Sequence, residues 1–286
     1  MRIIFMTVLV LCSLTGISQV SYSGFIGKYP IQLVTYIYSD GDARAIYAYD
    51  KFDTPIIING RKEGKNLKLF ERDSNDHISA SLKFENYDGK NADLTGIWIS
   101  RDSTKKYPIR LKKVFDAESD ADFHDKEILQ STSLDRYYFK LLISKTNGNA
   151  RVTGVKVLEK KTDRLIQKMR LDCQLWGLEN ISTGDYNFDG LMDFSVFEES
   201  YAGPNTTSIY ILRLPNSEKY FVSDFSGVSL EFDSNSKRIY EHNECCAGRS
   251  FMDATYKVVD NKMVLIERTC SEYDDEKEDF VNVKCD

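Results

Sequence analysis

Histidine is scarce in this sequence, and there is no excess of basic residues. The three histidines (His77, His124 and His242) lie far apart, and neither an H-E-x-x-H nor a G-x-S-x-G motif occurs. Lys and Arg total 38 against 44 Asp and Glu, which gives a net charge of −6. A nucleic-acid partner requires a basic surface. We therefore expect neither an enzyme nor a nucleic-acid-binding protein. An acidic chain suits a basic partner, but charge alone does not select one, because acidity also keeps proteins soluble.

Long apolar runs are also missing, apart from one near the N-terminus. Residues 3–14 are almost entirely apolar, Arg2 precedes them, and a small-x-small sequence follows at residues 16–18. The run is shorter than the ~20 residues that a membrane-spanning helix needs, and no later run is longer. This pattern predicts a signal peptide at residues 1–18 and a periplasmic or secreted protein that does not span a membrane.

Cysteine is absent from the first half of the predicted mature chain. The second half holds Cys173, Cys245, Cys246, Cys270 and Cys285, without a C-x-x-C spacing that would indicate a thiolate metal site. Cysteines of an exported protein are expected to pair. A hairpin predicted to turn at residues 260–262 would bring Cys270 towards Cys245 and Cys246. We predict a bridge from Cys270 to one of these two, with one of the five cysteines left over.

Short runs of alternating polarity fill the first part of the chain and predict β-strands. Turn sequences such as Asp40-Gly41-Asp42 separate them, and helical spacing is absent between them. Seven or eight such strands predict an all-β domain at residues 19–115, an antiparallel meander that curls into a small barrel or half-barrel. The expected strands lie at residues 31–38, 43–49, 55–60, 67–70, 78–84, 94–99 and 107–111.

An acidic segment follows the meander. Residues 116–133 open with the sequence DAESDADFHD, which is almost free of apolar residues and predicts a linker. The only helix we expect is a short one at residues 126–131. Tandem strand pairs with polar turns then predict a second all-β domain at residues 134–286, either propeller-like or a β-sandwich.

The sequence DYNFDGLMD at residues 185–193 is typical of a calcium loop. Ca²⁺ prefers about 6–8 oxygen ligands. The side chains of Asp185, Asn187 and Asp189 would converge while Gly190 permits a sharp turn. The twelfth position is Val196 rather than Glu, which argues against an EF-hand and for a shorter loop between strands. The alternative is a solvated turn, since Asp, Asn and Gly are also ordinary turn residues.

Four segments of the second domain resemble a family of secreted bacterial calcium-binding proteins. They are residues 165–167 (LIQ), 184–193 (GDYNFDGLMD), 202–206 (AGPNT) and 209–212 (IYIL). The best-understood kind is the periplasmic immunity protein that inhibits a lysozyme-like effector delivered by a type IV secretion system, which is similar to invertebrate-type lysozyme inhibitors. The resemblance covers about residues 134–286. It implies inhibition of a lysozyme-like peptidoglycan hydrolase, with calcium ligands at Asp185, Asn187, Asp189, Leu191 and Asp193.

The loop after the calcium motif is the candidate contact with such a hydrolase. Gly203, Pro204, Asn205 and Thr206 would project near the metal and enter the cleft of the enzyme. The alternative is an ordinary hairpin loop, because Gly-Pro-Asn is a common loop composition.

The two tryptophans suggest a different function. Exposed aromatic rings stack on sugars, so Trp98 and Trp176 are candidates for a carbohydrate surface, although most aromatic residues of a β protein pack in its core. The alternative function is therefore a cell-envelope or carbohydrate-binding module without inhibitory activity, with a glycan as its partner.

Overall fold

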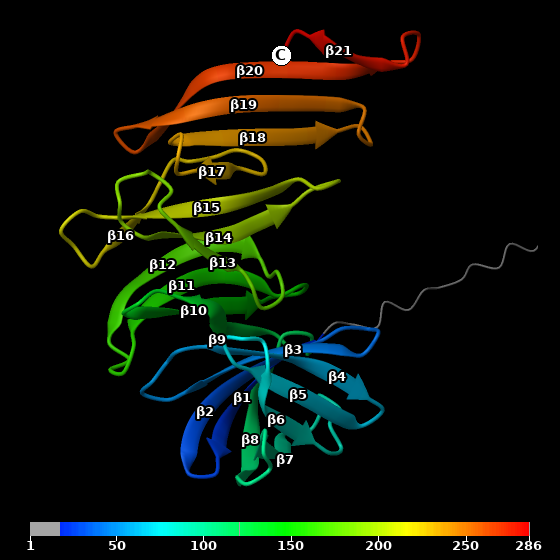
Figure 1. Cartoon of the computed structure of the whole chain (residues 1–286), viewed down its shortest axis with the longest axis vertical. Coiled ribbons are helices and arrows are strands. Elements are labelled where there is room, and N and C mark those ends of the chain that lie inside the picture. The colour runs from blue at the N-terminus through cyan, green and yellow to red at the C-terminus, as the bar shows by residue number, and fades with distance from the viewer. Residues whose placement is uncertain (1–17, 120, 286) are drawn as a thin grey trace, which may run out of the picture.

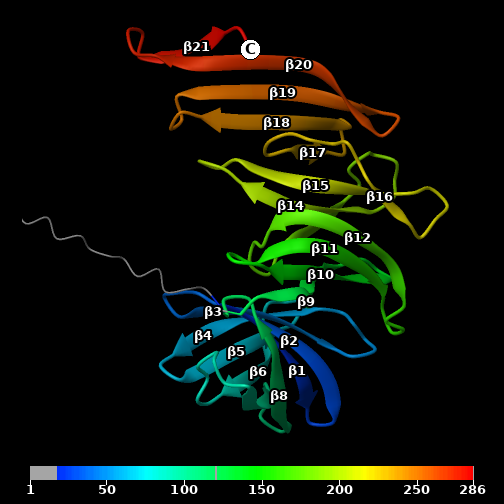
Figure 2. The ribbon, with the colours of Figure 1, turned by 180° about the vertical axis from the view of Figure 1, so that it is seen from behind.

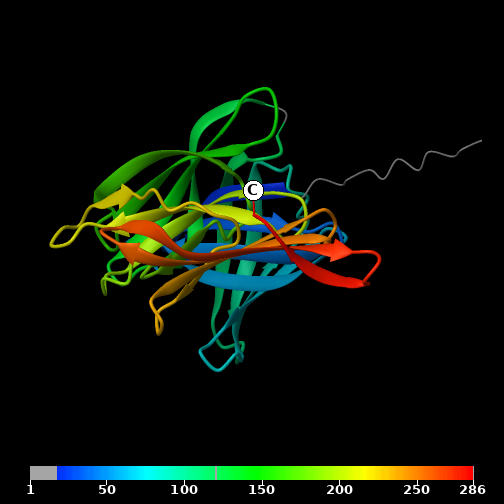
Figure 3. The ribbon, with the colours of Figure 1, turned by 90° about the horizontal axis from the view of Figure 1, so that it is seen from above.

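The protein consists of a closed barrel followed by three further antiparallel sheets. The computed structural model describes residues 18–119 and 121–285, so residues 1–17 of the predicted signal peptide lie outside the described part. Figure 1 shows the barrel at one end, with the three sheets stacked above it in chain order, and Figure 3 looks down this stack. The described residues contain strands and no helix, which confirms the prediction of an all-β protein. They accordingly include no long apolar helix that could cross a membrane.

Strands β1–β8 form the barrel. They are β1 (Ser18–Ile26), β2 (Tyr29–Ile37), β3 (Asp42–Tyr49), β4 (Ile56–Glu63), β5 (Asn66–Arg72), β6 (Ile78–Phe84), β7 (Asp93–Ser100) and β8 (Lys106–Asp116). Each strand pairs antiparallel with the next, and β1 also pairs with β8, which closes the barrel. The seven strands expected from the sequence are all present, and the meander is confirmed as a closed barrel.

Alternation along these strands fills the barrel interior with apolar side chains. Leu33, Ala45, Ile58, Leu69 and Leu82 come from five successive strands and are fully buried. A glycine is required where two strands approach most closely. A Cβ at Gly60 on β4 would lie only 1.9 Å from the carbonyl oxygen of Lys68 on β5. The barrel is therefore a packed core rather than an open channel.

Three sheets follow, each an antiparallel meander of consecutive strands. The first contains β9 (Phe123–Ser133), β10 (Tyr137–Lys145), β11 (Arg151–Glu159) and β12 (Leu165–Gln174). The second contains β13 (Ile181–Gly184), β14 (Asp193–Ser200), β15 (Thr206–Arg213) and β16 (Tyr220–Val222). The third contains β17 (Glu231–Asp233), β18 (Arg238–Cys245), β19 (Ser250–Val259), β20 (Lys262–Asp274) and β21 (Asp279–Val283). The view from behind shows the same row of sheets (Figure 2).

The helix predicted at residues 126–131 is wrong, because these residues belong to β9. Within the predicted linker at residues 116–133, the stretch 123–133 forms this strand and pairs with β10. Ile128 and Leu129 are both buried, since β9 lies between the barrel and the rest of its sheet. A short apolar run fits a helix or a strand equally well, so only pairing with β10 decides between them.

Continuous apolar packing connects the barrel with the sheets. One core cluster contains Val34 and Ile46 from the barrel, Phe139 from the first stacked sheet and Phe194 from the second. A smaller cluster, including Tyr210 and Ile239, lies between the second and third sheets. The sheets are therefore held to one another and to the barrel by buried side chains.

The disulfide joins Cys270 to Cys285, so the predicted bridge from Cys270 to Cys245 or Cys246 is wrong. The hairpin of β20 and β21 places the two Cα atoms 5.3 Å apart. Cys245 lies opposite Ser250 on β19, and Ser250 lies opposite Glu272 on β20. A whole strand thus separates Cys245 from β20. Two strand spacings, about 10 Å, exceed the reach of a disulfide.

We expect peptide mapping without reductant to recover Cys270 joined to Cys285. The two cysteines are separated by 15 residues, and closing a loop of that length stabilises a protein by about 3 kcal/mol in the chain-entropy relation. Replacing both with serine should lower the free energy of unfolding by about 2–3 kcal/mol, measured by urea denaturation. The control is the exposed pair Cys245 and Cys246, whose replacement by serine should change stability by less than about 0.5 kcal/mol. A peptide joining Cys270 to either of them would contradict the structure.

Candidate functional site

The predicted calcium loop connects β13 to β14 in the second stacked sheet. The carboxylate of Asp185 accepts the backbone N–H of Asp189 at 3.0 Å and that of Gly190 at 2.8 Å. Oδ1 of Asn187 accepts the N–H of Asp189 at 3.3 Å, and Oδ1 of Asp189 accepts that of Leu191 at 2.8 Å. Gly190 has φ +87°, a conformation that favours glycine. The segment is therefore curled, with its side-chain oxygens directed towards its own backbone.

Asp193 ends the loop in a buried position. Its side chain is fully buried, and its two carboxylate oxygens accept the N–H groups of Tyr186 at 2.9 Å and Arg213 at 2.8 Å. Burial raises the pKa of Asp193 to about 6, the carboxylates of Asp189 and Asp185 also raise it, and the two backbone hydrogen bonds lower it. A buried carboxylate with further carboxylates nearby is an arrangement that a bound cation would stabilise.

The loop has the oxygen donors that calcium prefers, but its carboxylates do not gather at one point. Its predicted ligands offer only oxygen atoms, which calcium prefers. Among residues 18–119 and 121–285, no three His, Cys, Asp or Glu side chains gather closely enough to hold a metal. Nδ2 of Asn187 donates to Oδ2 of Asp189 at 2.9 Å. Calcium would have to replace this hydrogen bond and draw the oxygens together, so calcium binding stays a prediction.

The loop also contacts the third stacked sheet. Nδ2 of Asn187 donates to Oδ1 of Asn261 at 2.8 Å, and Asn261 lies in the turn between β19 and β20. This turn lies where the sequence predicted a hairpin at residues 260–262, and that prediction is confirmed. A change in the conformation of the calcium loop would therefore also alter this hydrogen bond between the second and third sheets.

The predicted partner loop connects β14 to β15 and is exposed at its tip. Tyr201 is 50% exposed, and Ala202, Gly203 and Pro204 are exposed beside it. The backbone N–H of Tyr201 donates to the carbonyl of Asn205 at 2.9 Å, which closes the loop. Tyr201 is not among the residues predicted from the sequence, although it stands two positions before Gly203-Pro204.

The side chain of Asn205 anchors this loop, and the backbone of Thr206 is held at its end. Asn205 is buried, and its Nδ2 donates to Oδ1 of Asn243 at 3.1 Å and to the carbonyl of Glu244 at 2.6 Å. Its Oδ1 accepts the N–H of Glu244 at 3.1 Å. Thr206 begins β15, and its N–H donates to Oγ of Ser229 at 3.3 Å. Of the four predicted contact residues, Gly203 and Pro204 are therefore exposed, Thr206 is half-buried and Asn205 is buried.

The structure brings neither the histidines nor Trp98 into a common site. His77 precedes β6, His124 lies on β9, and His242 lies on β18 with Nδ1 2.7 Å from Oδ1 of Asp253. Trp98 donates from Nε1 to Glu71 and packs against Tyr107, so it belongs to the barrel wall.

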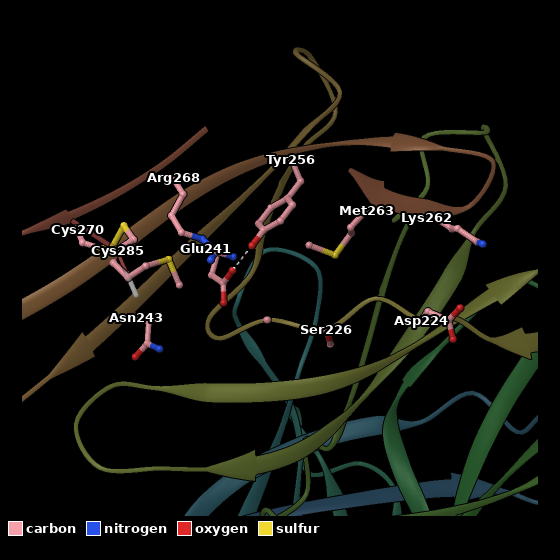
Figure 4. Close-up of a pocket in the computed structure, with 12 residues that line it drawn as sticks. Asp224, Ser226, Glu241, Asn243, Tyr256, Lys262, Met263, Arg268, Cys270 and Cys285 are labelled. Atoms are coloured by element: carbon pink, nitrogen blue, oxygen red, sulfur yellow. Dashed lines mark hydrogen bonds between the residues drawn. A yellow bond between two sulfur atoms is a disulfide. The ribbon is translucent and has the colours of Figure 1, made fainter. Parts of the chain in front are cut away.

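A polar pocket of about 740 Å³ opens on the inner face of the third sheet (Figure 4). Oε1 of the buried Glu241 accepts the N–H of Val228 at 2.8 Å, and its Oε2 accepts the hydroxyl of Tyr256 at 2.6 Å. The lining contains two acidic residues, Asp224 and Glu241, and two basic ones, Lys262 and Arg268. Through its bond to Val228, Glu241 holds the segment before β17 against the third sheet.

Comparison with known proteins leaves the family of this chain open. No protein-family model and no curated protein matches it. Among solved structures it is similar to the crystal structure of a protein from Lactobacillus plantarum, with 9% sequence identity, coverage of 93% of this chain and 95% of that chain, and a TM-score of 0.28. A likeness this weak carries no argument. The class of protein is therefore defined by its own structure, an eight-stranded antiparallel barrel followed by three stacked antiparallel sheets.

Proposed function

We propose that this protein is an exported, calcium-stabilised inhibitor of a lysozyme-like peptidoglycan hydrolase that acts in the periplasm or outside the cell. The observation that carries the proposal is the exposed loop tip at residues 201–204 with a buried anchor at Asn205. The resemblance of residues 134–286 to periplasmic immunity proteins supports the class of target. In this proposal the protein binds the hydrolase and performs no chemistry of its own.

The loop has the rigidity that an inserted inhibitory segment needs. Three hydrogen bonds fix the side chain of Asn205 to β18, and the backbone bond from Tyr201 to Asn205 closes the loop. A segment already fixed in its bound shape loses little conformational entropy on binding. Tyr201 adds a large exposed ring of the kind that dominates interface energetics.

Charge supports a basic hydrolase as the partner. The chain has a net charge of −6, and Oε2 of Glu199 lies 3.4 Å from the hydroxyl of Tyr201 beside the loop. Opposite charges accelerate association, and salt screens that attraction. The association rate with a basic hydrolase should therefore fall as the salt concentration rises.

We expect stoichiometric inhibition of at least one enzyme in a panel of lysozyme-like hydrolases, assayed by the clearing of suspended peptidoglycan. Tyr201→Ala combined with Pro204→Gly should weaken inhibition by tenfold or more, because it removes the aromatic contact and loosens the loop. A tenfold loss corresponds to about 1.4 kcal/mol.

A matched control is available at the other end of β15. The turn between β15 and β16 also carries an exposed Leu214-Pro215 pair. Leu214→Ala combined with Pro215→Gly makes an equivalent change there and should leave inhibition unchanged. The proposal fails if no hydrolase of the panel is inhibited at micromolar protein, or if the two double variants lose inhibition equally.

A further inference from the structure

A second pocket lies at the junction of the barrel and the stacked sheets. Its volume is about 420 Å³, within the usual range for small-molecule sites. Tyr36 of β2, Tyr38 just after it and Arg44 of β3 line it from the barrel. Residues 175–179, which connect β12 to β13, line it from the sheets. The pocket therefore combines aromatic rings with charged groups from segments far apart in the sequence.

Trp176 presents one aromatic face at this pocket. The ring packs against Phe197 of β14, with centroids 5.0 Å apart and an interplanar angle of 32°. Trp176 nevertheless remains 54% exposed. A large ring supported on one side and open on the other is suited to stack on a flat apolar ligand surface.

The loop that carries Trp176 is rigid. The backbone N–H of Trp176 donates to Oδ1 of Asn180 at 2.6 Å, and Nδ2 of Asn180 donates to the carbonyl of Gly177 at 3.0 Å. Nε2 of Gln19 on β1 donates to the same carbonyl at 2.9 Å. Asn180 and Gln19 are almost completely buried. The ring is thus positioned before any ligand binds, which lowers the entropic cost of binding.

A charged pair supplies hydrogen-bonding groups beside the ring. Arg44 donates from Nη2 to Oε1 of Glu179 at 2.9 Å and from Nη1 to Oε2 at 3.4 Å. The two side chains are 42% and 50% exposed, so they remain accessible. A guanidinium has more N–H groups than this pair uses, and a carboxylate accepts further hydrogen bonds. The charges of the lining cancel, which favours a neutral ligand rich in hydroxyl groups.

We propose that this pocket binds a neutral pyranose unit of a glycan. The apolar C–H face of the sugar stacks on Trp176, and its hydroxyls bond to Arg44 and Glu179 through charge-assisted hydrogen bonds. Tyr36 and Tyr38, whose ring centroids are 4.9 Å apart in an edge-to-face contact, also line the pocket. This inference goes beyond inhibition of a hydrolase, because the pocket includes none of residues 201–204.

The test is titration calorimetry of the mature protein with two neutral tetrasaccharides, tetra-N-acetylchitotetraose and cellotetraose, which share their linkage and differ in the acetamido groups. We expect saturable binding of at least one sugar. Trp176→Ala should weaken that binding by tenfold or more, whereas Trp176→Phe, which keeps a ring, should weaken it less. Glu179→Gln keeps the shape of the side chain and should also weaken binding, since it replaces a charged acceptor.

Two controls separate this inference from loss of folding and from the inhibitory loop. Tyr240 on the third sheet is 41% exposed, and Tyr240→Ala should leave sugar binding unchanged. Tyr201→Ala combined with Pro204→Gly should also leave it unchanged while weakening inhibition. Absence of binding of either sugar at millimolar concentration overturns the inference, as does equal binding by the wild type and Trp176→Ala with both proteins folded by circular dichroism.

Discussion

Replacing Phe194 with alanine is expected to lower the free energy of unfolding by about 3–5 kcal/mol. Phe194 on β14 is fully buried. Its ring centroid lies 4.8 Å from that of Phe139 on β10 and 5.1 Å from that of Tyr220 on β16. The side chain therefore fills the core between the first and second stacked sheets. Its loss would remove buried apolar surface and leave a cavity that the rigid sheets close only in part.

Urea denaturation followed by tryptophan fluorescence measures this loss. Phe52, in the turn between β3 and β4, is 67% exposed, so Phe52→Ala makes the same chemical change outside the core. We expect the control to differ from the wild type by less than about 0.5 kcal/mol. A similar small effect for Phe194→Ala would show that the first and second sheets do not pack as described.

Calcium is expected to stabilise the protein strongly after treatment with a chelator. A ligand that binds only the folded state adds about 2.7 kcal/mol at a hundredfold excess over its Kd. Asp185→Ala or Asp189→Ala should abolish this gain, measured as the shift in melting temperature on adding calcium. Asp73 is a matched control, because its carboxylate also accepts backbone N–H groups in a polar turn, from Asn75 and His77. Asp73→Ala should keep the full calcium response.

The calcium response should depend on pH through Asp193. Its pKa is raised from 3.8 to about 6, so folding favours the protonated carboxyl group. The stability that this group contributes is fully present below a pH of 3.8, the ordinary pKa that Asp has in the unfolded chain. That contribution is lost as the pH rises through 6. Calcium needs the ionised carboxylate, so its affinity should fall as the pH is lowered through 6. The stabilisation by calcium should therefore be larger at pH 8 than at pH 5.

One result would contradict the calcium site. If neither chelator nor added calcium changes the melting temperature at pH 8, the segment at residues 185–193 is only a turn held by its own hydrogen bonds. In that case Asp185→Ala would lower stability equally with and without calcium, because it loses the bonds to Asp189 and Gly190.

Local pattern predicted most of the strands and turns of this protein, although not β9. Side chains alternate between the two faces of a strand, so runs such as residues 31–38 and 78–84 predict strands with one buried face. Turn residues at Asp260 and Asn261 marked the hairpin between β19 and β20, and both have positive φ there. The spacing of Asp185, Asn187, Asp189 and Gly190 likewise indicated a curled segment. These features depend on residues close together in the chain.

Contacts between distant residues decided the rest, and the sequence does not state which segments meet. Residues 123–133 form a strand and not a helix because they pair with β10 and pack against the barrel. The partner of Cys270 depends on strand order, which places β19 between Cys245 and β20. The pocket beside Trp176 exists only because the barrel meets the loop before β13. The alternation of polar and apolar residues and the turn sequences were enough to determine an all-β chain. Which distant side chains lie together was decided by the pairing of the strands and the order of the sheets.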